Sequence, residues 1–87
     1  MSSNLERLKG ALASYSRSTQ QQASRLDPVQ REFQKSSQQI LSLIGGSSQR
    51  KEAEVQSAVN EAREQVKRAA DALRRAAKIA ESYGRSL

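Results

Sequence analysis

The sequence predicts an all-α protein, an antiparallel hairpin of two long helices joined by a short bend. Apolar residues recur with alternating spacings of three and four in both halves of the chain, which is the pattern of a helical seam. The adjoining glycines, Gly45 and Gly46, fall near the middle of the 87 residues. Aromatic residues make up only 3% of the chain, so a thick globular core is not expected. Residues 1–87 are therefore expected to form a single helical domain.

The first helix is expected over about residues 3–44. Two series of positions, each with a spacing of seven residues, build its seam. The first series is Leu5, Leu12, Thr19, Leu26, Phe33 and Ile40, and the second is Leu8, Tyr15, Gln22, Val29, Ser36 and Leu43. Ser2, Ser3 or Asn4 is expected to cap the helix, with Glu6 favourable in the first turn.

Pro28 conflicts with a continuous first helix, because proline removes a backbone donor at a cost of about 3 kcal/mol. Asp27-Pro28 is also a typical start of a new helix. The seam nevertheless keeps its register from Leu26 to Val29 and onward. The pattern therefore favours one helix, kinked near residue 28, over two separate helices.

The bend is expected at residues 45–47 and the second helix at about residues 48–85. Ser47 or Ser48 is the expected N-cap. The seam positions of this helix are Val55, Val59, Ala62, Val66, Ala69, Leu73, Ala76, Ala80, Tyr83 and Leu87. The many alanines among them predict a close approach of the neighbouring backbone.

The second helix has more apolar surface than one neighbouring helix covers. The additional apolar residues beside its seam are Ala58, Ala70, Ala72, Ala77 and Ile79. A second molecule would cover this stripe and give a four-helix bundle dimer. The residues expected to form the core and the dimer seam are Leu26, Phe33, Ile40, Val55, Val59, Val66 and Leu73.

The composition argues against catalysis. The chain contains neither histidine nor cysteine, so the commonest general base, the thiolate nucleophile and the commonest metal ligands are missing. The paired acids Glu52/Glu54 and Glu61/Glu64 lie on the expected polar face of a helix. We therefore expect no enzyme, no catalytic, cofactor-binding or metal site, no cofactor and no small-molecule substrate.

The formal net charge is +6, and the second helix carries many of the basic residues. Those expected opposite its seam are Lys67, Arg68, Arg74, Arg75, Lys78 and Arg85. Acids stand four residues before three of them, in the pairs Glu64–Arg68, Asp71–Arg75 and Glu81–Arg85. A solvated, self-paired face is therefore favoured over binding of nucleic acid or an anionic membrane, which stays as a weaker alternative.

The bend and the end of the second helix contain residues that are similar to those of a known family. The bend contains Leu43-Ile44-Gly45, and the chain ends in Tyr83-Gly84-Arg85-Ser86-Leu87. A hairpin of this length with a small-residue bend resembles the WXG family of type VII secretion proteins, whose bend carries Trp-x-Gly. Here the glycine is present and Leu43 stands in the place of the tryptophan. Many members also carry Tyr-x-x-x-acid after the second helix. Tyr83 matches that tyrosine as a remnant of the motif, or is plain seam packing, whereas Leu87 replaces the acid.

The resemblance implies a small helical secretion protein, either a substrate or a partner and adaptor, that acts by helix-bundle dimerisation. The implied partners are the chain itself or a homologous small helical protein, together with a larger secreted effector or the secretion ATPase. It also implies secretion without a cleaved signal peptide, alongside a partner that carries the missing signal. The main alternative is a cytoplasmic coiled-coil scaffolding module. No apolar run approaches the roughly 20 residues that span a bilayer.

Overall fold

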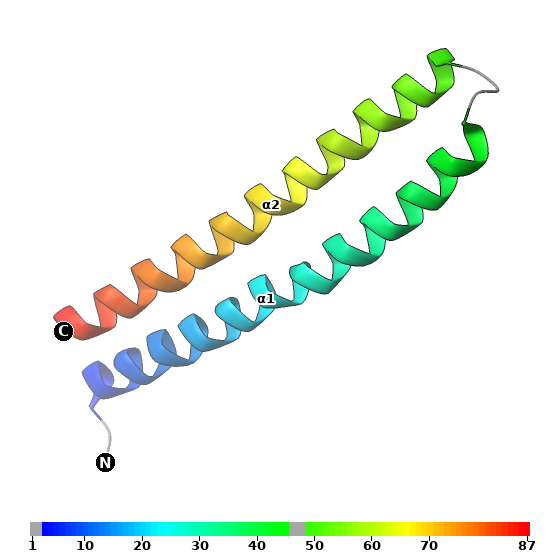
Figure 1. The fold of residues 1–87 in the computed structure, drawn as a ribbon. Coiled ribbons are helices and arrows are strands. Elements are labelled where there is room, and N and C mark those ends of the chain that lie inside the picture. The colour runs from blue at the N-terminus through cyan, green and yellow to red at the C-terminus, as the bar shows by residue number, and fades with distance from the viewer. Residues whose placement is uncertain (1–2, 46–48) are drawn as a thin grey trace. The chain divides into compact units, whose positions relative to one another are not determined.

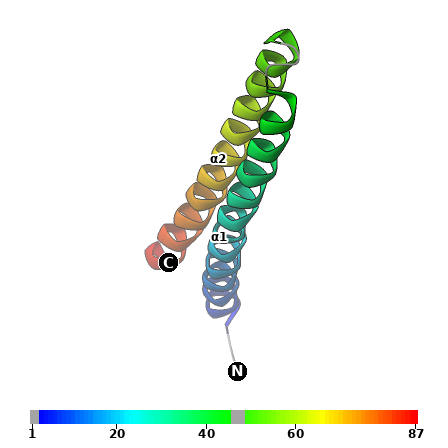
Figure 2. The same ribbon diagram turned by 45° about the vertical axis from the view of Figure 1, so that its right-hand side comes forward.

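The computed structural model describes residues 3–45 and 49–87. It contains two helices, α1 (Asn4–Ile44) and α2 (Gln49–Ser86), which pack against each other as a hairpin (Figures 1 and 2). The predicted all-α hairpin is therefore confirmed. Over the residues described, neither helix has an apolar stretch that could cross a bilayer.

Ser3 is the N-cap of α1. The Glu6 N–H donates a hydrogen bond to Ser3 Oγ (3.1 Å), and the Arg7 N–H donates one to the Ser3 carbonyl oxygen (3.1 Å). The first bond satisfies a backbone donor of the first turn that has no intrahelical partner, and the second is the first i→i−4 bond of the helix. The N-caps predicted for α2, Ser47 and Ser48, lie outside the described residues.

Pro28 lies inside α1, and the helix continues through it. Because proline has no backbone N–H, the i→i−4 hydrogen bond to the Ser24 carbonyl is missing at this point. The helix does not restart at Asp27.

The hairpin divides into two compact units, and each contains a segment of both helices. The terminal unit comprises Met1–Arg25 and Ala69–Leu87, and the bend unit comprises Leu26–Arg68. Each unit is described by itself below.

Small side chains form the core of the terminal unit. Its buried residues are Ser16, Thr19, Ala23, Ala70, Ala77 and Ala80. A Cβ atom added at Gly84 would lie 3.6 Å from Leu12 Cβ, an ordinary van der Waals contact. The two backbones therefore approach closely here, as the alanines predicted.

The bend unit has a thinner core. Ser37 is the one buried residue among those described there. Larger side chains are only half-buried: Leu26, Leu41, Ile44, Val55, Val59 and Val66. No large side chain in the described part of either unit is fully buried.

The seam of α1 differs from the predicted one. The predicted first series is partly retained, since Leu12 and Leu26 are half-buried and Thr19 is buried. The predicted second series is wrong within one hairpin, because its members Leu8, Tyr15, Val29 and Leu43 are exposed. The inward positions instead lie one residue later: Ser16, Ala23, Gln30, Ser37 and Ile44. The smaller side chains thus face α2, and the larger apolar side chains remain outside.

The seam of α2 follows the prediction as far as Val66. Beyond it, Leu73, Ala80 and Leu87 keep their predicted inward positions, whereas the series Ala69, Ala76 and Tyr83 is replaced by Ala70, Ala77 and Gly84, one residue later. Ala70 and Ala77, expected beside the seam, are buried, whereas Ala69 is exposed. Near the end of the helix, Gly84 faces Leu12 and Tyr83 is exposed. A glycine fits the close backbone approach at this position, and a tyrosine ring does not.

Candidate interaction face

The side to which a residue points follows from its place relative to the core. Each residue of a helix is rotated by about 100° from the one before it. Two antiparallel helices are related by a local two-fold axis perpendicular to both. Residues that directly precede core positions therefore point to one side of the pair on both helices, and residues that directly follow them point to the opposite side.

In the terminal unit these two sides differ in chemistry. The residues that precede the core positions are Tyr15, Ser18, Gln22, Ala69, Ala76, Ile79 and, before half-buried Gly84, Tyr83; those that follow are Arg17, Gln20, Ser24, Asp71, Lys78, Glu81 and Arg85. One side is therefore mainly apolar and contributed by both helices. The other side is polar and charged.

The terminal apolar face is defined here by Leu8, Tyr15, Ala69, Ala76 and Tyr83. Leu8 stands one heptad before Tyr15, and both are exposed. Tyr15 and Tyr83 are each 50% exposed. Two large aromatic residues therefore remain half in water on the same side of the unit, although burial of such a ring is strongly favourable.

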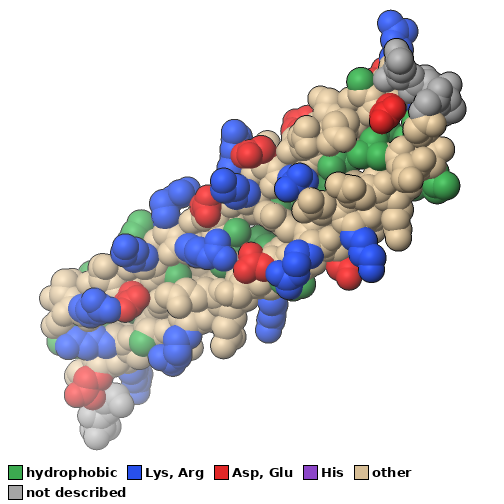
Figure 3. Space-filling model, viewed as in Figure 1, with side chains coloured by type: hydrophobic (Ala, Val, Ile, Leu, Met, Phe, Trp, Pro, Cys, Tyr) green, Lys and Arg blue, Asp and Glu red, His purple; other side chains and the backbone are tan. Residues whose placement is uncertain are grey.

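The opposite, polar side of the terminal unit carries a shallow hollow between the helices. Gln20 and Ser24 of α1 line it together with Arg74, Lys78 and Glu81 of α2. Figure 3 shows one face of the molecule, on which Asp and Glu lie among the more numerous Lys and Arg and the widest hydrophobic area lies near the bend. Charges of both signs are thus interspersed rather than collected into one basic patch.

The predicted i,i+4 ion pairs are present only in part. Glu81 and Arg85 form the expected pair. Asp71 instead pairs with Arg74, three residues later (Oδ1 to the guanidinium nitrogen, 3.7 Å), and not with Arg75. Both pairs are exposed, so each contributes at most about 1 kcal/mol.

In the bend unit, the exposed apolar residues come mainly from α1. Val29 and Leu43 directly precede the inward positions Gln30 and Ile44, while Phe33 and Ile40 lie one turn before inward positions. From α2, Ala58 directly precedes half-buried Val59 on the same side. We define the bend apolar face by Val29, Phe33, Ile40, Leu43 and Ala58.

The residues of the predicted bend motif have different environments. Leu43 is 82% exposed, whereas Ile44, the last residue of α1, is half-buried. The Gly45 N–H donates to the Leu41 carbonyl oxygen (3.0 Å), and a Cβ at Gly45 would lie 3.3 Å from the Ser42 carbonyl oxygen. Gly45 therefore allows a tight helix end. Gly46 lies outside the described residues.

The residues predicted for the core and dimer seam fall into two groups. Leu26, Val55, Val59, Val66 and Leu73 are half-buried in the hairpin. Phe33 is 37% exposed and Ile40 is 50% exposed, so neither is a core residue of a single chain. Their place in a dimer seam stays a prediction. Tyr83 lies within α2, and its carbonyl oxygen accepts a hydrogen bond from Ser86 Oγ (2.8 Å).

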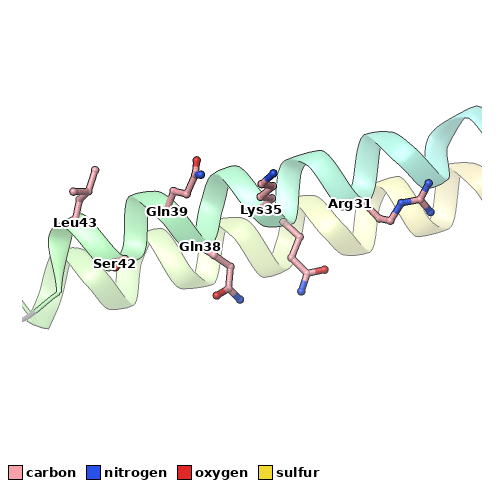
Figure 4. Close-up of a pocket in the computed structure, with 7 residues that line it drawn as sticks. Arg31, Lys35, Gln38, Gln39, Ser42 and Leu43 are labelled. Carbon is pink, nitrogen blue, oxygen red and sulfur yellow. The ribbon is translucent and has the colours of Figure 1, made fainter.

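A wide surface hollow on α1 is not an enclosed site. Its lining residues are Arg31, Gln34, Lys35, Gln38, Gln39, Ser42 and Leu43. All seven belong to α1, and Figure 4 shows that they project from this helix in different directions. Sites for small molecules bury most of the ligand between converging walls, and one helix surface does not supply such walls. Among the described residues, no group of three His, Cys, Asp or Glu could hold a metal ion.

The accessible surface of the chain is large for its mass. It amounts to 6720 Å² for a chain of 9.6 kDa. A compact folded monomer of that mass is expected to expose about 5100 Å². The chain therefore exposes about 1,600 Å² more than a compact monomer of the same mass.

No family model, curated protein or solved structure matches this chain. The likeness to WXG hairpins consequently stays a prediction from the bend and the C-terminal residues. What the geometry offers by itself is an apolar face in each unit, contributed in the terminal unit by both helices and in the bend unit mainly by α1.

Proposed function

We propose that the protein acts by helix-bundle pairing, in which a second helical hairpin covers the apolar faces and completes a four-helix bundle. One observation carries this proposal. In the terminal unit, both helices place exposed apolar residues on the same side, including Tyr15 and Tyr83, while the opposite side is charged. A single amphipathic helix would need one neighbour, whereas a two-helix apolar face fits another two-helix layer.

The surface of the chain supports a partner of this size. Its accessible surface of 6720 Å² exceeds the value for a compact monomer by about 1,600 Å². A standard protein interface removes about 800 Å² from each partner. A second hairpin that pairs with the first would be expected to cover the exposed apolar faces with an interface of this ordinary size.

The biological role that we propose is that of a WXG-like small protein of a type VII secretion system. It would be a secreted substrate, or a partner and adaptor of one. Two features support this role: exposed Leu43 and Gly45 occupy the positions of the family's bend signature, and exposed Tyr83 occupies that of the C-terminal tyrosine. The proposed partners are the chain itself or a homologous small helical protein, and beyond them a larger effector or the secretion ATPase.

The pairing is tested by sedimentation equilibrium of the purified protein and of a Tyr15→Glu variant. We expect the wild type to dimerise and the variant to dissociate at least about 100-fold more readily, because a carboxylate would be buried in the apolar layer. Ser24→Glu introduces the same charge on the polar side and serves as the control. A wild-type chain that stays monomeric at high micromolar concentration would refute the proposed pairing.

The secretion role is tested separately, in a host with a type VII system. We expect the protein in the culture medium of the parent strain and only in the cells of a strain that lacks the secretion ATPase. Detection in washed cells alone, in both strains, would favour the alternative of a cytoplasmic scaffolding module and would leave the pairing proposal standing.

A further inference from the structure

The terminal unit carries exposed basic residues that the proposed pairing does not use. The unit has eight Lys or Arg against three Asp or Glu. Two of the three acids are engaged on α2, since Asp71 pairs with Arg74 and Glu81 pairs with Arg85. The third acid, Glu6, lies in the first turn of α1. The α1 part of the unit is therefore basic along nearly its whole length.

The segment of α1 from Arg7 to Arg25 contains no acid. Neither Arg7, Arg17 nor Arg25 has an Asp or Glu three or four residues away in either direction. Among the described residues, no ion pair involves these three arginines. The basic residues of α2 in this unit differ, because each has Asp71 or Glu81 within one turn. Local neutralisation by acids is thus available on α2 and missing on α1.

The three arginines lie on the side of α1 that points away from its core positions. Those positions are Leu12, Ser16, Thr19 and Ala23. At about 100° per residue, one set of residues points more than about 120° away from their mean direction. Besides Gly10, the set consists of Arg7, Ser14, Arg17, Ser18, Gln21 and Arg25, and all are exposed. This outward face of α1 has no acid and no large apolar side chain.

Part of the outward face groups its polar side chains closely. Arg17, Gln21 and Arg25 stand four residues apart, so they are neighbours along the helix surface. Together with Gln20 and Ser24 they line a shallow hollow. Guanidinium, amide and hydroxyl groups are the donors that hold phosphate oxygens in complexes with nucleic acids. One helix gives no walls to enclose a small molecule, but a phosphate backbone lies along a surface and needs none.

We propose that the outward face of α1 binds the phosphate backbone of a double-stranded nucleic acid, without reading its sequence. Charge complementarity selects this partner. Arg7, Arg17 and Arg25 are spread over about 27 Å of helix, whereas duplex DNA carries a negative charge about every 1.7 Å of its axis. Each arginine therefore meets a phosphate whatever the register of the duplex.

The chemistry of the outward face argues against two other polyanions. A helix that binds an anionic membrane buries large apolar side chains in the lipid surface beside its basic residues, and the outward face has none. A single strand is held by aromatic rings on which its bases stack. The tyrosines of this unit, Tyr15 and Tyr83, belong to the terminal apolar face instead. A duplex, which presents its phosphates on the outside, fits the outward face better than either.

This inference goes beyond the proposed helix-bundle pairing and does not depend on it. The terminal apolar face, which a second hairpin would cover, shares no residue with the outward face of α1. A single hairpin and a paired one therefore present the same three arginines.

The inference is tested by fluorescence anisotropy with a labelled DNA duplex at several salt concentrations. We expect the logarithm of the wild-type binding constant to fall with the logarithm of the salt concentration with a slope of about −3, since each of three phosphate contacts contributes about −0.9. The variant R7Q/R17Q/R25Q should bind at least about tenfold more weakly at low salt and lose most of this slope. Circular dichroism checks its helix content, which glutamine at exposed helical positions should preserve.

Two matched variants separate the site from the net charge. R68Q/R74Q/R85Q removes the same charge from α2, at positions three or four residues after an acid, and should weaken binding by less than about threefold. R7K/R17K/R25K retains the charge of the outward face and should keep the wild-type salt slope.

The contrary outcomes are distinct. Equal losses in the two glutamine variants would show that net charge alone acts, and a wild type that does not bind the duplex at low salt would end the inference. Tighter binding to vesicles of phosphatidylcholine and phosphatidylserine than to the duplex would assign the face to a membrane and overturn the proposal. The pairing is measured separately, because R7Q/R17Q/R25Q should sediment as the wild type does. Failure of nucleic-acid binding would therefore leave the proposed pairing standing.

Discussion

The terminal unit and the bend unit consist of the same two helices, yet they pack differently. In the terminal unit, Ala23 and Ala77 are 0% exposed, and Gly84 stands against Leu12. In the bend unit, larger side chains face each other and remain half-buried, and the buried residue described there is Ser37. Close packing in this hairpin thus depends on small side chains. Where larger aliphatic side chains lie between the helices, they stay only half-buried.

The two units also differ in what they leave exposed. The terminal unit exposes apolar residues from both helices, whereas the bend unit exposes them mainly from α1, bordered by acids of α2. The better-packed unit carries most of the net positive charge. Packing within the hairpin and recognition of a partner are therefore distributed differently along the same helices.

Among the variants that test this difference in packing, Pro28→Ala in the bend unit should change the free energy of unfolding the most. The variant restores the backbone donor to the Ser24 carbonyl, so the free energy of unfolding should rise by up to about 3 kcal/mol. Thermal unfolding at fixed protein concentration measures it. Hydrogen exchange should become slower around residues 24–32 and change less near Ala77. Gln34→Ala, at an exposed helical position, is the control and should shift stability by only a few tenths of a kcal/mol.

The next largest effect is expected from enlarging a buried alanine of the terminal unit. Ala77→Leu should lower the free energy of unfolding by about 1–3 kcal/mol, because the close backbones leave no space for a larger side chain. Ala62→Leu, at a half-buried position of the bend unit, should cost clearly less. Equal losses in urea unfolding of the two variants would show that the units are packed alike.

The removal of the exposed ring of Phe33 should have a moderate effect on the hairpin. Complete burial would make Phe33→Ala cost about 3–5 kcal/mol. Since Phe33 is 37% exposed in one chain, the loss measured on a monomer in dilute solution should stay below that range. At concentrations where the wild type dimerises, the same variant should lose dimerisation. A loss of 3 kcal/mol or more in the monomer would place the ring in the core of the hairpin.

The smallest effect is expected at the N-cap of α1. Ser3→Ala removes the acceptor for the Glu6 N–H and should destabilise the terminal unit by about 1 kcal/mol. Ser3→Asp, which also accepts this bond, should retain the wild-type stability. Amide exchange of the first turn, followed by NMR, should become faster in the alanine variant and remain slow in the aspartate variant.

Much of the fold follows from periodicity, since a heptad pattern interrupted once by Gly45-Gly46 predicts two helices and their direction. The facing positions are less predictable. Ala69-Ala70 and Ala76-Ala77 are consecutive alanines, so hydrophobicity alone cannot choose which one faces inward. The close approach of the two backbones places Ala70, Ala77 and Gly84 at the inward positions, because the ring of Tyr83 does not fit between the helices.

The candidate interaction face was harder to predict for the same reason. The largest apolar residues of α1 were expected to face α2, by the rule that large apolar residues are buried. In the terminal unit, Leu8 and Tyr15 are exposed because Ser16, Thr19 and Ala23 permit tighter packing. Sequence periodicity identifies the apolar residues of α1, among them Tyr15, Val29 and Phe33. It does not show whether they face α2 or another molecule.

The contact between Leu12 and Gly84 also bears on how the chain folds. These residues stand 72 positions apart, whereas residues beside the bend are close in sequence. Closing the long loop carries the larger entropic cost, yet the tight packing lies at that end. If the hairpin forms from the bend outward, it therefore gains little free energy of folding until it is nearly complete. We expect a single cooperative folding transition, without a populated half-closed intermediate.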